Sequence, residues 1–225
     1  MKCYALLPYV TKRTEDASIR EKRCRELVYA FKNLRGARKC YRGPSRSYED
    51  ILGYLESQFR SLPGVSSRTL YVPVPSSRAT DETALLKWPA FDLASKLNGG
   101  ICKVYLRRTK SIQKSSRTDD EDLDPDLEPN DRSLDVHART LEFPFSIDAQ
   151  WNKVCLVDDC VTYGGTLLGA EKAIRKAGFN GDIIGATAAF TVSKDMERDR
   201  TNAAFDLEEG RGPKKYRSPE GWWLY

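Results

Sequence analysis

Residues 153–168, KVCLVDDCVTYGGTLL, constrain the fold more than any other stretch of this chain. They begin with a short apolar run of β-forming residues, Val154 to Val157, which is typical of a buried central strand in an α/β sheet. Two acids, Asp158 and Asp159, follow at the point where this strand is expected to end. A turn of small residues then leads into a helical pattern, so the stretch predicts a strand, a ligand-facing turn and a helix.

The turn after the two acids has the composition of a phosphate site. It consists of Thr162, Tyr163, Gly164, Gly165 and Thr166. Backbone N–H groups at the start of a helix lack partners within the helix, and the helix dipole favours negative charge there. The carboxylates of Asp158 and Asp159 would repel the same phosphate, so hydroxyl groups suit them better as partners. The pattern therefore predicts a site for a sugar that carries a phosphate.

Three other protein classes place acids at the end of an apolar strand, and the chain departs from each of them. A receiver domain has its paired acids near the N-terminus and has no Thr/Gly loop after them. A Walker B strand requires a P-loop, and the chain contains no GxxxxGK[ST] motif. A Rossmann dinucleotide site requires GxGxxG, which is also missing.

The order of apolar strand, Asp-Asp, two residues and Thr-x-Gly-Gly-Thr resembles the phosphoribosyl pyrophosphate (PRPP) signature of type I phosphoribosyltransferases. In that family the acids hold the ribose 2′ and 3′ hydroxyls, and the Thr/Gly loop holds the 5′-phosphate. The resemblance implies the first role for Asp158 and Asp159, which we take as candidate catalytic residues, and the second role for residues 162–166.

A second loop of the family is expected upstream. Residues 68–75, RTLYVPVP, predict a strand, and the turn after it consists of Ser76, Ser77 and Arg78. This segment resembles the pyrophosphate loop, most closely that of the ComF-like branch associated with DNA uptake. The turn supplies hydroxyl, backbone and guanidinium donors for phosphate oxygens. The alternative is an ordinary strand-to-helix turn with a capping Ser or Thr80.

Basic residues also follow the next expected strand, residues 101–106. They are Arg107 and Arg108, and they become candidates for PRPP binding at the same edge of the sheet. The segment beyond them, residues 109–140, is too long and polar for an ordinary connection. In the family a long mobile loop at this position closes over PRPP. The resemblance therefore assigns residues 109–140 to that loop, with Lys114, Arg132 and His137 as candidate catalytic contacts to pyrophosphate.

Charge is distributed unevenly along the chain. Residues 118–131 carry eight acids and no Lys or Arg, whereas residues 12–46 carry twelve Lys or Arg. The acidic tract departs from the family's loop pattern and suits an autoinhibitory mimic of PRPP, a partner contact or a disordered insertion. The basic region suits nucleic acid, an acidic protein partner or a solvated helix face.

Length and composition place the chain among globular proteins. Its 225 residues suit a single α/β domain. The six cysteines show no CxxC spacing, so the zinc ribbon common at the start of ComF-like proteins is missing. No apolar run has the length of a signal peptide or a membrane span, and we expect a soluble, cytoplasmic protein with no membrane contact.

The alternation of strands and helices predicts a central parallel sheet flanked by helices. The resemblance sharpens this to the type I phosphoribosyltransferase fold, with a small hood made from the chain ends. Residues 1–64 are expected to hold an N-terminal strand and helices, residues 65–192 the PRPP-binding core, and residues 193–225 the C-terminal hood and tail. The first strand, residues 2–10, is expected at the sheet edge because Pro8 would interrupt a central ladder.

The resemblance implies an enzyme that transfers or releases ribose 5-phosphate with loss of pyrophosphate, using Mg²⁺ held mainly by PRPP oxygens. A non-catalytic PRPP- or nucleotide-binding module of a DNA-uptake or defence assembly is the alternative, because a fold does not fix an activity. A nucleotide-processing effector is a third option. Partners would use the basic region, the acidic tract or the tail residues Trp222 and Trp223, and a homodimer is a further option. The sequence leaves the acceptor open.

Overall fold

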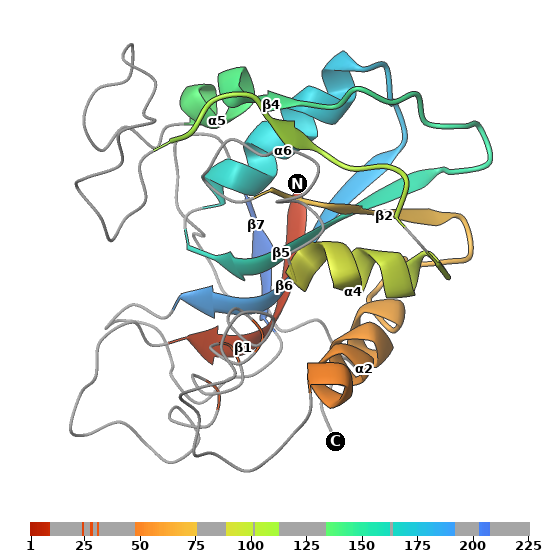
Figure 1. The fold of residues 1–225 in the computed structure, drawn as a ribbon, viewed down its shortest axis with the longest axis vertical. Coiled ribbons are helices and arrows are strands. Elements are labelled where there is room, and N and C mark those ends of the chain that lie inside the picture. The colour runs from red at the N-terminus through yellow and green to blue at the C-terminus, as the bar shows by residue number, and fades with distance from the viewer. Residues whose placement is uncertain are drawn as a thin grey trace.

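The computed structural model describes residues 1–9, 48–75, 89–100, 102–112, 134–162, 164–191 and 203–207, together with Cys24, Val28 and Phe31. These residues form an α/β fold around a five-stranded sheet with the order β2-β5-β6-β1-β7 (Figure 1). The strands are β1 (Lys2–Tyr9), β2 (Thr69–Pro73), β5 (Lys153–Val161), β6 (Asp182–Thr191) and β7 (Ala203–Asp206). Strands β2, β5, β6 and β1 lie side by side in that order and run parallel to one another, and β7 pairs with β1 in the antiparallel direction. The predicted α/β class with a central parallel sheet is confirmed.

Helices cover both faces of the sheet. On one face lie α2 (Tyr48–Arg60) and α4 (Pro89–Leu97), and on the other lie α5 (Leu134–Thr140) and α6 (Gly165–Lys176) (Figure 1). A separate antiparallel pair, β3 (Arg107–Arg108) and β4 (Leu141–Glu142), lies on the α5–α6 side. None of the described helices is long and apolar enough to cross a lipid bilayer.

The apolar spacing of its sequence accounts for α2. In α2 the apolar residues Ile51, Leu52, Leu55 and Phe59 make one stripe, and all four are buried against the sheet. Cys24, Val28 and Phe31 are also helical, and they are buried in the same cluster. Burial of these stripes removes apolar area from water, which is the main stabilising contribution to such a layer.

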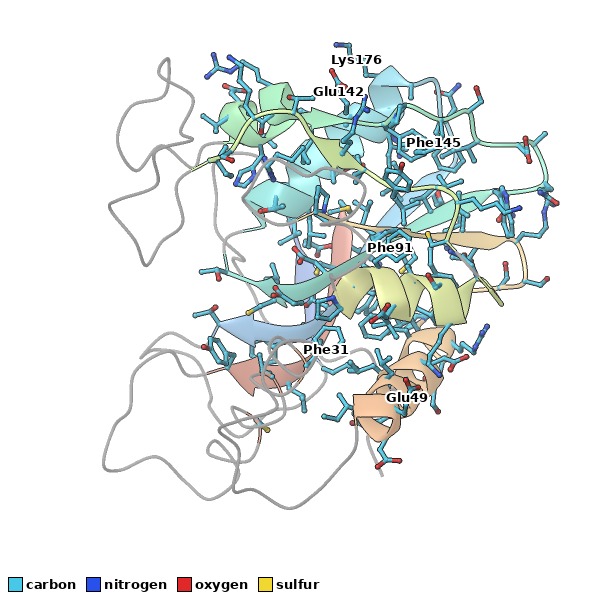
Figure 2. The ribbon with its side chains drawn as sticks, viewed as in Figure 1. Phe31, Glu49, Phe91, Glu142, Phe145 and Lys176 are labelled. Carbon is cyan, nitrogen blue, oxygen red and sulfur yellow. The ribbon has the colours of Figure 1, made fainter. Side chains whose placement is uncertain are left out.

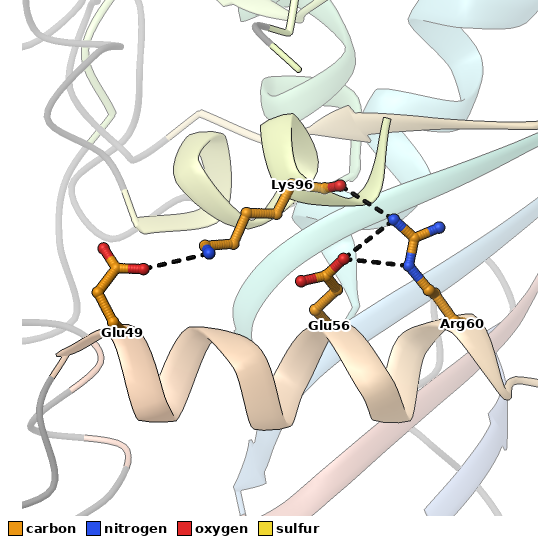
Figure 3. A network of polar contacts seen from close by, with 4 residues as sticks. All are labelled: Glu49, Glu56, Arg60 and Lys96. Atoms are coloured by element: carbon orange, nitrogen blue, oxygen red, sulfur yellow. Dashed lines mark hydrogen bonds and ion pairs between the residues drawn. The ribbon is translucent and has the colours of Figure 1, made fainter. Parts of the chain in front are cut away.

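Polar contacts between α2 and α4 add little to this burial. Lys96 Nζ lies 3.1 Å from Glu49 Oε2, and Arg60 Nη2 donates to the Lys96 carbonyl at 3.0 Å and to Glu56 at 3.0 Å (Figure 3). The side chains concerned are largely in contact with water, and exposed ion pairs contribute at most about 1 kcal/mol. The apolar cluster therefore holds the two helices together.

The first strand does not lie at the edge of the sheet. β1 is flanked by β6 and by β7, so the edge placement predicted for residues 2–10 is wrong. β7 pairs only with Lys2 to Ala5, and Pro8 lies beyond it, where β1 has a single neighbour among the described strands. β1 and β7 thus belong to the main sheet, and most of the segments expected to form the hood lie outside the described residues.

The strand predicted over residues 101–106 is also not found, since residues 102–106 have no regular structure. This segment instead connects the two apolar clusters around the β2 edge. The Tyr105 ring contacts Phe145 edge-on at a centroid distance of 4.9 Å and lies 6.3 Å from Phe91; Figure 2 labels both phenylalanines. Aromatic packing therefore takes the place of strand pairing here.

On the outer edge of β2, the backbone groups of Tyr71 form hydrogen bonds with a side chain. The amide of Asn98 accepts from the Tyr71 N–H at 3.0 Å and donates to the Tyr71 carbonyl at 2.8 Å. Tyr71 is buried, so both backbone groups would otherwise lack water as a partner. Asn98 thus pairs with Tyr71 as a residue of a neighbouring strand would.

We expect Asn98→Ala to lower the free energy of unfolding by about 2–4 kcal/mol, because two buried backbone groups each lose a partner. Urea unfolding would measure the loss. Asn152→Ala is the matched control: Asn152 is exposed and is expected to change stability by less than about 0.5 kcal/mol. Equal, small effects of the two substitutions would show that the edge pairing contributes nothing.

Candidate functional site

Asp158 and Asp159 lie inside β5, and two further residues of the strand follow them. β5 continues to Val161, whereas the sequence pattern placed its end before Asp158. On one side β2 stops at Pro73, which pairs with Val157, and the Val74 N–H donates to the Val157 carbonyl at 2.9 Å. On the other side β6 continues beside β5 to the end of the strand. Among the described strands, β5 therefore has no β2 partner at the two acids, and this part of β5 is called the open edge below.

Asp158 and Asp159 have different surroundings. Asp158 is 9% exposed, whereas Asp159 is only partly buried, and the Asp159 N–H donates to Asp158 Oδ1 at 2.7 Å. Burial raises the pKa of the Cys3 thiol, and the negative charge of Asp158 raises it further. Cys3 packs in the cluster under α6, so the Asp158 carboxylate acts on that side of the sheet. The acids are thus a buried and a more accessible carboxylate rather than an equivalent pair.

The predicted turn begins α6 as expected. Gly164 has φ +80° and lies at the N-cap, and the helix starts at Gly165. A Cβ atom at Gly164 would come within 2.8 Å of the Leu207 side chain and would force an L-residue into the left-handed region. The backbone N–H groups of the first helical turn lie directly after this glycine, in the position from which helices bind anions.

A hydrogen bond also joins the turn between β5 and α6 to the end of β6. The hydroxyls of Thr162 and Thr191 lie 2.8 Å apart, and Thr191 is the last residue of β6. Thr162 is exposed, and Thr166 is partly buried in the first turn of α6. The carboxyl ends of β5 and β6 therefore hold the start of α6 in place.

Arg108 and His137 lie close together in the interior of the protein. Arg108 is 1% exposed and His137 is 6% exposed. Arg108 Nη1 donates to the Thr140 hydroxyl, and Arg108 Nη2 lies 3.4 Å from His137 Nδ1. Burial lowers the pKa of the Arg108 guanidinium to about 10, and the negative charge of Asp158 opposes this shift. Neither side chain is on the surface where the sequence interpretation placed a phosphate ligand.

Two details of the sequence interpretation change with this geometry. Residues 109–140 are not one loop, because residues 134–140 form α5 and carry His137. Arg107, the other arginine assigned to PRPP, is exposed and its guanidinium lies 3.4 Å from the Glu142 carboxylate. Successive strand residues point to opposite faces. That alternation is a signal by which one of the two arginines could have been expected to lie inside.

Several predicted site residues lie outside the described part of the chain. They are Ser76, Ser77, Arg78, Lys114, Arg132 and Tyr163, and the same holds for the Lys and Arg residues of the basic region, the acidic tract of residues 118–131, and Trp222 and Trp223. Their assignments stay predictions.

Carboxylate oxygens are the metal-binding atoms that the open edge offers. Among the described residues, no group of three or more His, Cys, Asp or Glu side chains is arranged to hold an ion. Mg²⁺ commonly takes one or two protein carboxylates and completes its six ligands with substrate oxygens and water. Asp158 and Asp159 fit an ion held in that way, with most ligands supplied by a bound phosphate compound.

Comparison of the sequence with protein-family models gives no match, and comparison with curated proteins gives none either. The case for a function therefore rests on the residues of the site and on their order along the chain.

Proposed function

We propose that this protein binds PRPP at the open edge of β5 and transfers or releases its ribose 5-phosphate unit with loss of pyrophosphate. One observation carries the proposal. Two acids at the point where β2 ends are followed, within one short turn, by a left-handed glycine that starts α6. Carboxylates accept hydrogen bonds from sugar hydroxyls, and helix-start amides bind a phosphate, so this order suits a phosphorylated sugar.

The reaction would break the bond between C1′ and a pyrophosphate oxygen and form a bond between C1′ and a nitrogen nucleophile. The electron pair of the broken bond leaves with pyrophosphate, and the sugar passes through an oxocarbenium-like state. Asp158 and Asp159 would orient the ribose ring through its hydroxyls, and residues 164–166 would hold the 5′-phosphate. Mg²⁺, held mainly by PRPP oxygens, would neutralise charge on the departing pyrophosphate.

Binding is the first test. Isothermal titration calorimetry with Mg²⁺ should detect PRPP and should give weaker binding for ribose 5-phosphate and for pyrophosphate, each of which fills only part of the site. Failure of PRPP to bind at millimolar concentration would overturn the proposal.

Turnover is the second test, and it separates an enzyme from a binding module. The protein would be incubated with PRPP, Mg²⁺ and a pool of bases, and products would be followed by mass spectrometry. Pyrophosphate release that depends on one base would identify a transferase and its acceptor. PRPP binding without any release would favour the regulatory or partner module.

A further inference from the structure

Thr191, the last residue of β6, contacts the turn that precedes α6. The register of β5 and β6 ends where Val161 pairs with Phe190. One position further along each segment, the hydroxyl oxygens of Thr162 and Thr191 lie 2.8 Å apart, which is the distance of a hydrogen bond between hydroxyls. A side-chain bond thus continues the pairing of the two strands into the turn.

The Thr191 hydroxyl lies between two side chains of the segment that carries the acids. Phe190 packs in the cluster under α6, so Thr191 points toward the opposite face of the sheet, because successive strand residues alternate. Cys160 packs against the cluster of that face, and its Sγ lies 3.7 Å from Thr191 Oγ1. Thr191 therefore contacts both Cys160 and Thr162, and a distant part of the chain supplies it.

The direction of the bond between the two hydroxyls determines what Thr162 can offer to a ligand. Each hydroxyl has one proton and two acceptor lone pairs, and one proton is used in the bond between them. If Thr162 donates, its proton is directed at Thr191. If Thr191 donates, the Thr162 proton can be directed at an acceptor on the ligand. Phosphate oxygens accept hydrogen bonds, so a bound phosphate favours donation from Thr191 to Thr162.

A hydroxyl at this place benefits from a fixed position, because the start of α6 follows at once. Thr162 is exposed and lies two residues before Gly164, which is the N-cap of α6. The Gly164 position is itself closely packed, since a Cβ atom there would lie 2.8 Å from the Leu207 side chain. Donors that are already oriented bind an anion without the loss of side-chain freedom that ordering them would require.

We propose that Thr191 is a positioning residue for the phosphate turn, which donates to Thr162 and so directs the Thr162 hydroxyl toward the bound phosphate. Thr191 acts through Thr162 and does not touch the ligand. The inference rests on the proposed function in one respect, the assignment of residues 162–166 to the 5′-phosphate.

The test compares three ligands by calorimetry, with Mg²⁺, at a temperature where thermal melts show every variant to be folded. Thr191→Val keeps the shape of the side chain and removes the hydroxyl. It should weaken the binding of ribose 5-phosphate and of PRPP by the same factor, about fivefold, as expected for one hydrogen bond between neutral groups. Binding of pyrophosphate, which has no 5′-phosphate, should be unchanged. Thr191→Ser keeps the hydroxyl and should bind all three ligands as the wild type does.

Two further variants separate positioning from a general loss of structure. In a Thr162→Val background, Thr191→Val should change the affinity for ribose 5-phosphate by less than about twofold, because the hydroxyl that it orients is gone. Thr69→Val is the matched control. Thr69 is buried at the start of β2, at the opposite end of the sheet, and its hydroxyl accepts from the Ser66 N–H at 3.0 Å. This substitution should lower stability and leave the binding of each ligand unchanged.

Each outcome bears on a different claim. Wild-type affinities in folded Thr191→Val, a serine variant no better than the valine variant, or an equal loss for pyrophosphate would each overturn the positioning role and leave the proposed function intact. A wild type that binds ribose 5-phosphate but not PRPP would overturn the proposed function, and Thr191→Val would still decide the positioning role with ribose 5-phosphate. A wild type that binds neither would overturn both.

Discussion

A variant that carries both Asp158→Asn and Asp159→Asn is expected to bind PRPP at least about 100-fold more weakly than the wild type. Hydrogen bonds to a charged acceptor contribute about 1.5–3 kcal/mol each, and every 1.4 kcal/mol is tenfold in affinity. Asparagine keeps the shape of the side chain and one acceptor oxygen but removes the charge. Calorimetric titration with PRPP and Mg²⁺ measures the effect, and unchanged binding would refute the assignment of this edge.

The single substitutions should differ, because the two acids have different surroundings. Asp159→Asn replaces a partly exposed acid and should reduce affinity with little loss of stability. Asp158→Asn should reduce both, since Asp158 is buried and its charge acts on Arg108. Asp182→Asn serves as the control: Asp182 is exposed at the opposite end of β6 and pairs with Lys153 at 3.6 Å. It should leave PRPP binding unchanged.

The second large effect concerns the contact between α5 and α6. Gly169→Ala is expected to lower the free energy of unfolding by about 2 kcal/mol. Alanine is favoured over glycine in a helix by about 1 kcal/mol. Here that gain is outweighed, because the new methyl group would lie 2.6 Å from His137 Cβ, 3.0 Å from the His137 carbonyl carbon and 3.1 Å from the Ala138 nitrogen. Two of these atoms are backbone, so α5 must move away, and overpacking of this kind costs about 1–3 kcal/mol or more.

A second glycine within a helix gives the matched control for this prediction. Gly53 lies in the middle of α2, is exposed, and has no atom within 4 Å of the place that a Cβ would occupy. Gly53→Ala should therefore stabilise the protein by about 1 kcal/mol. Chemical denaturation of both variants should give changes of opposite sign. Stabilisation by both would mean that α5 and α6 are not in close contact.

Local sequence patterns were sufficient to predict β5 and α6, the two elements on either side of the glycine turn. The apolar run at Val154 predicts β5, and the helical pattern after the glycine turn predicts α6. The stripe of Ile51, Leu55 and Phe59 likewise predicts α2. These features depend on neighbours within one or two turns of the chain, and residue spacing records them directly.

The length of β5 was less predictable, for a reason that lies outside the stretch itself. Acids usually mark the end of a strand, and the pattern therefore ended the strand before Asp158. In the structure β6 continues to pair with β5 as far as Phe190, which keeps Asp158 within the strand. Hydrogen bonds with β6 thus make β5 longer than its own residue pattern predicts.

Local residue patterns predict the strand, the two acids, the glycine turn and the helix, in an order that suits a phosphorylated sugar. The same patterns do not predict that β1 lies inside the sheet, that Asp158 is buried while Asp159 is more accessible, or that Arg108 lies inside while Arg107 faces water. These features depend on burial and charge compensation, which come from contacts between segments far apart in the chain. Arg107 and Arg108 are the same residue type at adjacent positions, and α5 supplies the hydrogen bonds that make one of them an interior residue.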